Sequence, residues 1–245
     1  MSGHSDVAIV GAGIAGASLA WQLAPTHRVL LLEAESQPGY HSTGRSAAMF
    51  MESYGPPQVR ALTRASRAFL AAPPNGFTDT PILSPRGALY VAWRGQEGEL
   101  EATAASLRAT GTPIERLDAA RTRERVPVLR ADGLVGALYE ADAMDIDVHA
   151  LHQGLLRGAR RGGAAQRHDA RLAAAVRRGS SWHLRCADGF EAEAAVLVDA
   201  AGAWADAVAG ACGVAAGRPP PPRGGAPPPS PPPRLPPPAP PPPAP

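Results

Sequence analysis

The stretch that decides the fold reads Asp6-Val7-Ala8-Ile9-Val10-Gly11-Ala12-Gly13-Ile14-Ala15-Gly16. A short apolar run, which predicts a strand, ends where three glycines begin in the spacing G-x-G-x-x-G. Between a strand and a helix, Gly11 allows a tight turn, Gly13 lets a diphosphate approach the backbone, and Gly16 lets the helix pack closely. The following helix, expected as far as Ala24, points free N–H groups at the phosphates.

An acid follows one strand later. The predicted second strand Arg28–Leu32 leads into Glu33, which stands 22 residues after Gly11, close to the spacing of about 20 expected for a carboxylate that accepts ribose hydroxyls. Strand, glycines, helix, strand and acid in this register predict a Rossmann-like α/β unit that binds a dinucleotide. The alternative is an incidental βα turn rich in Gly and Ala.

Two further segments carry small residues in suggestive places. His41–Ala48 is small and polar with a single arginine, so its hydroxyls and N–H groups can wrap a second phosphate or a flavin edge; an ordinary turn is the alternative. Ala195–Asp199 is a continuous apolar run that predicts a parallel strand buried on both faces. Ala200–Trp204 follows it as a second turn of small residues, before a helix expected from about Ala203 to Ala211.

Helical patterns occupy much of the middle of the chain. In the predicted helix Gln58–Ala72, we expect an apolar stripe that includes Val59 and Leu62, with the arginines facing water. The helix Val148–Arg161 carries His149 and His152 three positions apart. Because no third ligand stands at metal spacing, we expect a surface or capping role for both and no metal site.

Composition separates the end of the chain from the rest. Residues 219–245 contain 18 prolines in 27 positions, which predicts extended polyproline or disorder. All 24 basic residues are arginines, and three of them follow Gly217, where there is no acid. The remainder therefore carries 21 basic and 22 acidic residues, a net charge of −1 that does not indicate a nucleic-acid partner.

Cysteine usage and the first apolar run bear on location. Cys186 and Cys212 are isolated, as in a reducing cytosol. Val7–Ala20 follows an acid instead of basic residues and is too short to cross a bilayer, so we expect neither a signal peptide nor a transmembrane segment. The prediction is a cytoplasmic protein, with peripheral attachment to the inner membrane left open.

These residues resemble the FAD-dependent D-amino acid oxidase/dehydrogenase superfamily, and within it bacterial D-arginine dehydrogenase and other D-amino acid dehydrogenases most. The resemblance covers about residues 5–217. The matching segments are Gly11–Gly16, Gln37–Ala48, Pro57–Thr63, Val126–Arg130, Asp145–Asp147, Leu151–Gly154 and Val198–Trp204.

The resemblance implies non-covalent FAD as cofactor and a set of residues that hold it. Ile14 and Ala15 would join the glycine turn at the pyrophosphate, with Glu33 and Ala34 at the adenosine ribose. Leu172 would pair its backbone with the adenine, and Ala201 and Gly202 would lie near the flavin. The residues implied along the pyrophosphate and the isoalloxazine are His41, Ser42, Thr43, Gly44, Arg45, Ser46, Ala47 and Ala48.

The implied reaction transfers hydride from Cα of a D-amino acid to the flavin, and the imino acid then hydrolyses to a 2-oxo acid and ammonia. Tyr54 matches a tyrosine that contacts substrate, and Arg223 falls where the family has a carboxylate-binding arginine. Met49 and Ala88 match a histidine and a glutamate of the D-arginine enzyme. Because neither polar group is present, we expect a more apolar D-amino acid as substrate. The resemblance leaves the electron acceptor, a quinone or O₂, open.

The resemblance also implies domains. We expect a Rossmann-like FAD-binding domain in two parts, 1–85 and 147–217, a partial α+β substrate domain at 86–146, and a disordered Pro-rich tail at 218–245. Family members continue past this point into further substrate-domain strands. The tail is therefore hypothesised to be a frame-shifted or truncated reading of a GC-rich gene, which predicts weak activity, weak FAD binding and a colourless purified protein.

Two other functions stay open at this stage. The first 33 residues are equally compatible with an NAD-binding dehydrogenase, although the loop after Glu33 argues against it. A non-enzymatic protein that presents polyproline to aromatic grooves would explain the tail alone.

Overall fold

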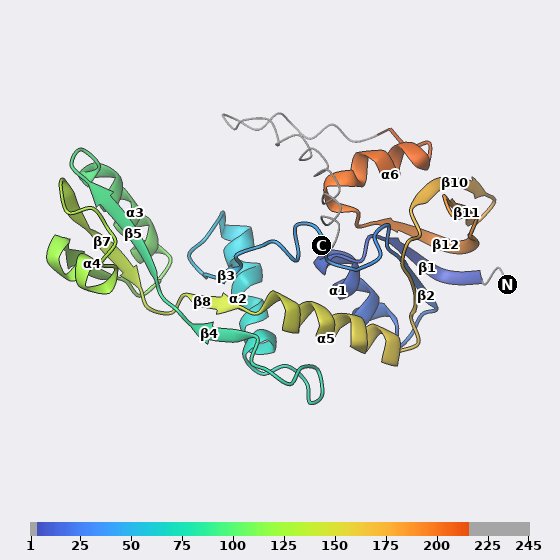
Figure 1. Cartoon of the computed structure of the whole chain (residues 1–245), viewed down its shortest axis with the longest axis horizontal. Coiled ribbons are helices and arrows are strands. Elements are labelled where there is room, and N and C mark those ends of the chain that lie inside the picture. Colours follow the sequence, from blue (N-terminus) through green and yellow to red (C-terminus); the bar gives the residue numbers. More distant parts are fainter. Residues whose placement is uncertain (1–3, 216–245) are drawn as a thin grey trace, which may run out of the picture.

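The computed structural model describes residues 4–215, which form an elongated molecule with a sheet at each end (Figure 1). The Pro-rich tail and Arg223 lie outside the described residues. No helix within residues 4–215 is long and apolar enough to cross a membrane.

The larger sheet has six strands in the order β10-β11-β12-β1-β2-β9. β1 runs parallel to β12 and to β2, and β2 runs parallel to β9, whereas β10, β11 and β12 pair antiparallel. The strands are β1 (His4–Val10), β2 (Val29–Leu32), β9 (Ala165–Arg167), β10 (Leu172–Arg178), β11 (Ser181–Cys186) and β12 (Glu191–Asp199). This mixed sheet with a parallel centre is the predicted α/β fold.

Helices cover both faces of this sheet. On one face, α1 (Ile14–Leu23) and α5 (Val148–Arg161) pack on Ile9 and Leu31. On the other face, α6 (Ala205–Ala211), which follows the 3₁₀ turn η1 (Gly202–Trp204), contributes Val208 to a second core. Because the central strands are buried on both sides, β1 and β2 read as continuous apolar runs.

A small sheet and a long helix connect the two ends of the molecule. β8 (Met144–Ile146) lies between β3 (Met49–Phe50) and β4 (Leu83–Pro85). α2 (Pro57–Ala71) begins at a proline after the loop that follows β3. These elements lie between the six-stranded sheet, which carries the glycine motif, and the sheet at the far end of the molecule (Figure 1).

The far end is a three-stranded antiparallel sheet in the order β5-β7-β6. α3 packs on it through Leu100, Ala104 and Leu107. The elements are β5 (Ala88–Trp93), α3 (Glu97–Ala109), β6 (Glu115–Asp118), α4 (Ala119–Arg125) and β7 (Leu134–Glu140). Asp118 caps α4, since its carboxylate accepts the Arg121 N–H at 2.8 Å.

Two predictions about β12 are wrong. The strand predicted over Ala195–Asp199 begins earlier, at Glu191, because its first half also pairs antiparallel with β11 while the strand runs parallel to β1. The second run is also not buried on both faces: Val196 is 49% exposed, whereas Val198 packs on the first core. The described helices cover the Val198 end of the strand and leave the Val196 side chain open.

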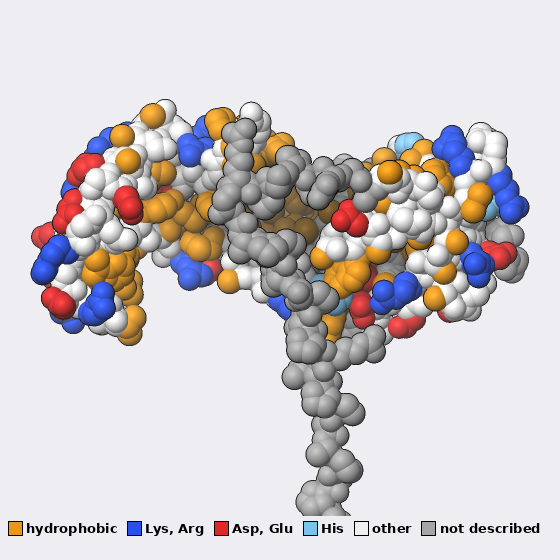
Figure 2. Space-filling model, turned by 90° about the horizontal axis from the view of Figure 1, so that it is seen from above, with side chains coloured by type: hydrophobic (Ala, Val, Ile, Leu, Met, Phe, Trp, Pro, Cys, Tyr) orange, Lys and Arg blue, Asp and Glu red, His pale blue; other side chains and the backbone are white. Residues whose placement is uncertain are grey.

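The faces of α2 also differ from the prediction. Leu62 is 69% exposed and Val59 is exposed as well, and Leu70 is the one buried residue of the helix. Arg67, by contrast, pairs with Glu52 at 2.5 Å and lies over the Phe50 ring. The helix therefore turns arginines toward the chain that precedes it, and hydrophobic side chains gather on the surface between the two ends of the molecule (Figure 2).

Candidate functional site

The glycine turn joins β1 to α1 at the edge where the strands of the parallel centre end. Gly11 has φ +104, and a Cβ there would lie 2.5 Å from the Ala200 carbonyl oxygen. A Cβ on Gly16 would lie 1.8 Å from the Gly11 oxygen. The turn after β1 and the small-residue turn after β12 therefore lie side by side at Gly11 and Ala200, and only glycine fits at positions 11 and 16.

Glu33 follows β2 and reaches back to this turn. Its Oε2 accepts the Ala12 N–H at 2.9 Å, and its Oε1 accepts the Glu35 N–H at 3.0 Å. The residue is 9% exposed. A carboxylate has about four acceptor positions, so Glu33 retains capacity for ligand hydroxyls while it supports the turn.

The loop 39–45 folds against the start of α1. The Thr43 hydroxyl accepts the Ile14 N–H at 3.0 Å, and a Cβ on Gly13 would lie 3.3 Å from that hydroxyl oxygen. The Gly44 N–H donates to the Gly39 carbonyl at 2.7 Å, which closes the loop on itself. Hydroxyl and amide groups thus collect beside the N-terminal end of α1, where a helix favours a phosphate.

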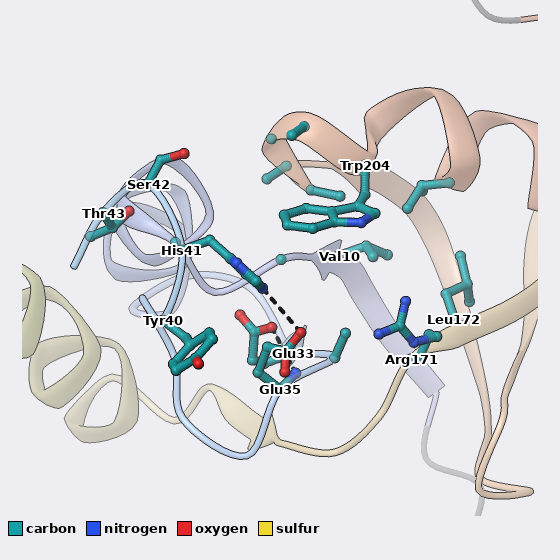
Figure 3. A pocket seen from close by; sticks show the side chains of 18 of the residues that line it. Val10, Glu33, Glu35, Tyr40, His41, Ser42, Thr43, Arg171, Leu172 and Trp204 are labelled. Atoms are coloured by element: carbon teal, nitrogen blue, oxygen red, sulfur yellow. Dashed lines mark hydrogen bonds and ion pairs between the residues drawn. The ribbon is translucent and has the colours of Figure 1, made fainter. Parts of the chain in front are cut away.

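These parts enclose a cavity of about 250 Å³ (Figure 3). This volume lies below the roughly 300–1,000 Å³ of pockets for whole drug-sized ligands, so the cavity suits one end of a dinucleotide. The predicted cofactor residues that line it are Gly11, Gly13, Glu33, Ala34, His41, Ser42, Thr43, Leu172, Ala201 and Gly202.

The other predicted cofactor residues are not part of this lining. Ile14 takes part through its N–H, and Gly16 through its contact with the turn. Arg45 donates to the Tyr40 carbonyl at 3.2 Å and lies over the Tyr40 ring. Ala15, Gly44, Ser46, Ala47 and Ala48 lie in the same two segments but line no part of the cavity.

Glu35, Arg171 and Trp204 are among the lining residues that the sequence did not single out as cofactor residues. His41 meets Trp204, with ring centroids 4.3 Å apart, and its Nε2 lies 3.0 Å from a Glu35 carboxylate oxygen (Figure 3). Arg171 points into the cavity from the opposite side (Figure 3). Trp204 ends the small-residue turn, which was the available signal; the position of Glu35 two residues after Glu33 was another.

Of the predicted substrate residues, Met49 and Tyr54 lie outside this cavity. Met49 is a half-buried residue of β3 that pairs with Asp145, and Tyr54 is 72% exposed. The loop that carries Tyr54 is fastened on one side by α2, since Arg60 donates to the carbonyl of the next residue, Gly55, at 2.7 Å. The structure thus holds the Tyr54 loop in place without bringing Tyr54 to the nucleotide cavity.

A buried carboxylate fastens the same loop on its other side. Glu140, 2% exposed at the end of β7, accepts the Ser53 hydroxyl at 2.6 Å and the Tyr90 hydroxyl at 3.2 Å. Burial raises the pKa of Tyr90, and the negative charge of Glu140 adds to the shift. No local sequence pattern predicts this cluster, because its three members come from segments far apart in the chain.

The prediction for the histidines of α5 is correct for one and wrong for the other. His149 is exposed. His152 is 3% exposed, and its Nε2 lies 2.8 Å from the Ala12 carbonyl oxygen in the glycine turn. It is buried because α5 packs directly on α1. Within residues 4–215, no group of three or more His, Cys, Asp or Glu side chains is arranged to hold a metal ion.

Comparison with known proteins gives a family and several relatives. The model of the family "DAO: FAD dependent oxidoreductase" matches residues 6–226. Glycine oxidase of Geobacillus kaustophilus (strain HTA426) is 31% identical over 216 residues, which cover 84% of this chain and 56% of that protein. The chain thus spans little more than half the length of this curated relative.

Solved structures agree with the family match. The crystal structure of glycine oxidase from Geobacillus kaustophilus has a TM-score of 0.75 and 26% identity, and the match covers 85% of this chain and 58% of that one. An L-α-glycerophosphate oxidase from Mycoplasma pneumoniae with FAD bound has a TM-score of 0.74 and 17% identity, covering 86% and 57%. The second likeness concerns the fold alone.

Proposed function

Because the chain belongs to the DAO family of FAD-dependent oxidoreductases, whose model spans residues 6–226, we propose that it oxidises the Cα–N bond of an amino acid, and of a D-amino acid in particular. One observation carries the proposal. The glycine turn, Glu33, the Thr43 hydroxyl and the small-residue turn after β12 all meet around one cavity.

The residues at this cavity fit the adenosine and diphosphate part of FAD. Glu33 would accept the ribose hydroxyls with its remaining lone pairs, and the N-terminal end of α1 would face the diphosphate. Gly13 leaves the space beside Thr43 free of a side chain. We propose the same role for the other predicted cofactor residues, including those of the Gly44–Ala48 segment, which would follow the cofactor toward its flavin.

When bound, FAD would accept the hydride that leaves Cα, and the resulting imino acid would hydrolyse in water to a 2-oxo acid and ammonia. The protein's task is then orientation: the substrate carboxylate needs a fixed partner and the amine a free lone pair. We propose Tyr54 as a substrate contact, on a loop held by Arg60 and Glu140. We also propose Met49 and Arg223 as residues of the substrate site; Arg223 lies outside the described residues.

The side chain of the substrate is proposed to be small or apolar. Met49 and Ala88 carry no charge that would bind a cationic side chain, and glycine oxidase acts on the smallest amino acid. That the chain resembles D-arginine dehydrogenase more than other members of the family stays a prediction. The electron acceptor, a quinone or O₂, stays open. We propose a cytoplasmic location because Cys186 and Cys212 are both free, as is usual in a reducing compartment.

We also propose that residues 1–85 and 147–217 act as one FAD-binding unit and that 86–146 belong to a substrate domain. The chain covers 56% of glycine oxidase, so the activity proposed here has to be measured on this chain itself.

The proposal is tested by titrating the purified chain with FAD and, separately, with NAD, following flavin absorbance near 450 nm and the heat of binding. FAD binding without NAD binding is expected. The loaded protein is then offered D- and L-alanine with an artificial electron acceptor, and pyruvate is measured; oxidation of the D-isomer is expected. Binding of NAD in place of FAD would refute the cofactor assignment, and oxidation of L-alanine alone would refute the stereochemical one.

A further inference from the structure

We propose that His152 is a positioning residue of the cofactor site: its imidazole holds the glycine turn and the loop 39–44 at a fixed separation on the two sides of the diphosphate. This inference rests on the proposed FAD-binding function and adds a residue from α5, a helix that lines no part of the cavity.

The first contact of His152 is with the glycine turn. Its Nε2 lies 2.8 Å from the Ala12 carbonyl oxygen, across 140 residues of sequence. A carbonyl oxygen only accepts, so Nε2 must carry the proton. The N–H of the same Ala12 donates to Glu33. Ala12 is therefore held on both sides, by the acid on one and by the histidine on the other.

The second contact is with the loop. A Cβ on Gly39 would lie 2.8 Å from Cε1 and 3.0 Å from Nδ1 of His152. The imidazole edge thus rests on the loop backbone where Gly39 has φ +79, and Gly39 in turn accepts the Gly44 N–H. Thr43, within this closed loop, accepts the Ile14 N–H. One ring therefore sets the distance between the turn and the loop that together border the diphosphate position.

The helix that carries His152 is itself fixed. A Cβ on Gly158 would lie 2.4 Å from the Trp21 ring of α1, and one on Gly154 would lie 2.3 Å from the Phe77 ring. These close approaches, one turn apart, anchor α5 against its neighbours. Burial lowers the pKa of His152, so at neutral pH the ring stays uncharged with a single proton to donate. Its position and its protonation are both defined before any ligand arrives.

The test compares three variants in FAD binding by calorimetry. His152→Leu fills the site without a donor, His152→Gln restores an N–H near Nε2, and His149→Gln changes an exposed histidine of the same helix. We expect the dissociation constant of FAD to rise roughly tenfold in His152→Leu. The Ala12 carbonyl loses the hydrogen bond that holds the turn in place, and the loss of one such bond shifts an equilibrium by about that factor. His152→Gln and His149→Gln should stay within about threefold of wild type on the same reasoning.

A second measurement needs no cofactor. Amide hydrogen exchange in the apo protein should speed up in both segments 11–16 and 39–44 of His152→Leu and return toward wild type in His152→Gln. Equal exchange in the Leu and Gln variants would show that the ring only fills space and would overturn the inference. If wild type binds no FAD, the proposed function fails, while the exchange comparison still decides the role of His152.

Discussion

Replacing Glu33 gives a direct measure of how far the acid supports the turn before any ligand binds. The carboxylate accepts two backbone N–H groups, from Ala12 at 2.9 Å and from Glu35 at 3.0 Å, and the residue is 9% exposed. A hydrogen bond to a charged acceptor contributes about 1.5–3 kcal/mol. Glu33→Ala loses both bonds, so we expect a loss of about 3 kcal/mol or more in the free energy of unfolding.

Glu33→Gln separates the two bonds. The amide keeps one carbonyl oxygen but places an NH₂ where the second acceptor stood, so one backbone N–H loses its partner. The expected loss is about half that of Glu33→Ala, roughly 1.5 kcal/mol. For a chain of this length, each kcal/mol corresponds to about 2–4 °C in Tm, so the Ala variant should melt about 6–12 °C below wild type and the Gln variant between them.

The assay is urea unfolding of the apo protein, with Glu191→Gln as the matched control, since Glu191 is an exposed acid of the same sheet. FAD titration of each variant then asks about the ribose contact. If Glu33→Ala unfolds at the wild-type urea concentration, the acid does not support the turn. If Glu33→Gln is as unstable as Glu33→Ala, the two hydrogen bonds do not contribute separately to the free energy of unfolding.

Four further outcomes are expected. Gly16→Ala should prevent folding, because its Cβ would lie 1.8 Å from a backbone oxygen, whereas Gly13→Ala should melt near wild type and lose FAD binding in a calorimetric titration. Glu140→Ala should lower the free energy of unfolding by about 2–4 kcal/mol in urea, because the buried Ser53 hydroxyl and the half-buried Tyr90 hydroxyl lose their acceptor; an unchanged free energy would show that Glu140 does not fasten the Tyr54 loop. Trp204 lines the cavity, so FAD should quench its fluorescence, and a Phe variant should show a smaller quench. Burial lowers the pKa of His152 below its ordinary value of 6.5, so as the pH falls the histidine takes up a proton in the unfolded chain before it does so in the folded one. The free energy of unfolding should therefore rise with pH just below 6.5 in urea titrations of wild type, and rise less in His152→Gln.

Local signals in the sequence predicted the elements and the first wall of the site. Gly11 and Gly16 were assigned from spacing alone, and the structure shows backbone oxygens where their Cβ atoms would be. The helix Val148–Arg161 was predicted with its observed bounds, because its apolar repeat and the Asp147 cap are both local. Hydrogen bonds within one turn, and steric limits within one βα unit, are recorded in neighbouring residues and can therefore be read from them.

What the sequence could not predict depends on which surfaces meet. His152 and His149 have the same local pattern, and only the packing of α5 on α1 buries one of them and leaves the other exposed. The arginines of α2 form a helical stripe that is typical of a solvated face, yet Arg60 and Arg67 bind the loop before the helix. Val196 sits in an apolar run, and its exposure follows from what lies over the sheet, which no spacing records.

The site that emerges is held together by groups far apart in sequence that share one peptide unit. Glu33 binds the N–H of Ala12 and His152 lies at its carbonyl, so a residue with no polar side chain becomes the junction of β2, α5 and the glycine turn. A ribose ligand on Glu33 would act on the same carboxylate that supports the turn. Nucleotide binding and the geometry of the diphosphate loop are therefore coupled through one carboxylate, and changes at Glu33 and at His152 should be non-additive in FAD affinity. A double variant whose loss equals the sum of the single losses would show that the two contacts act independently.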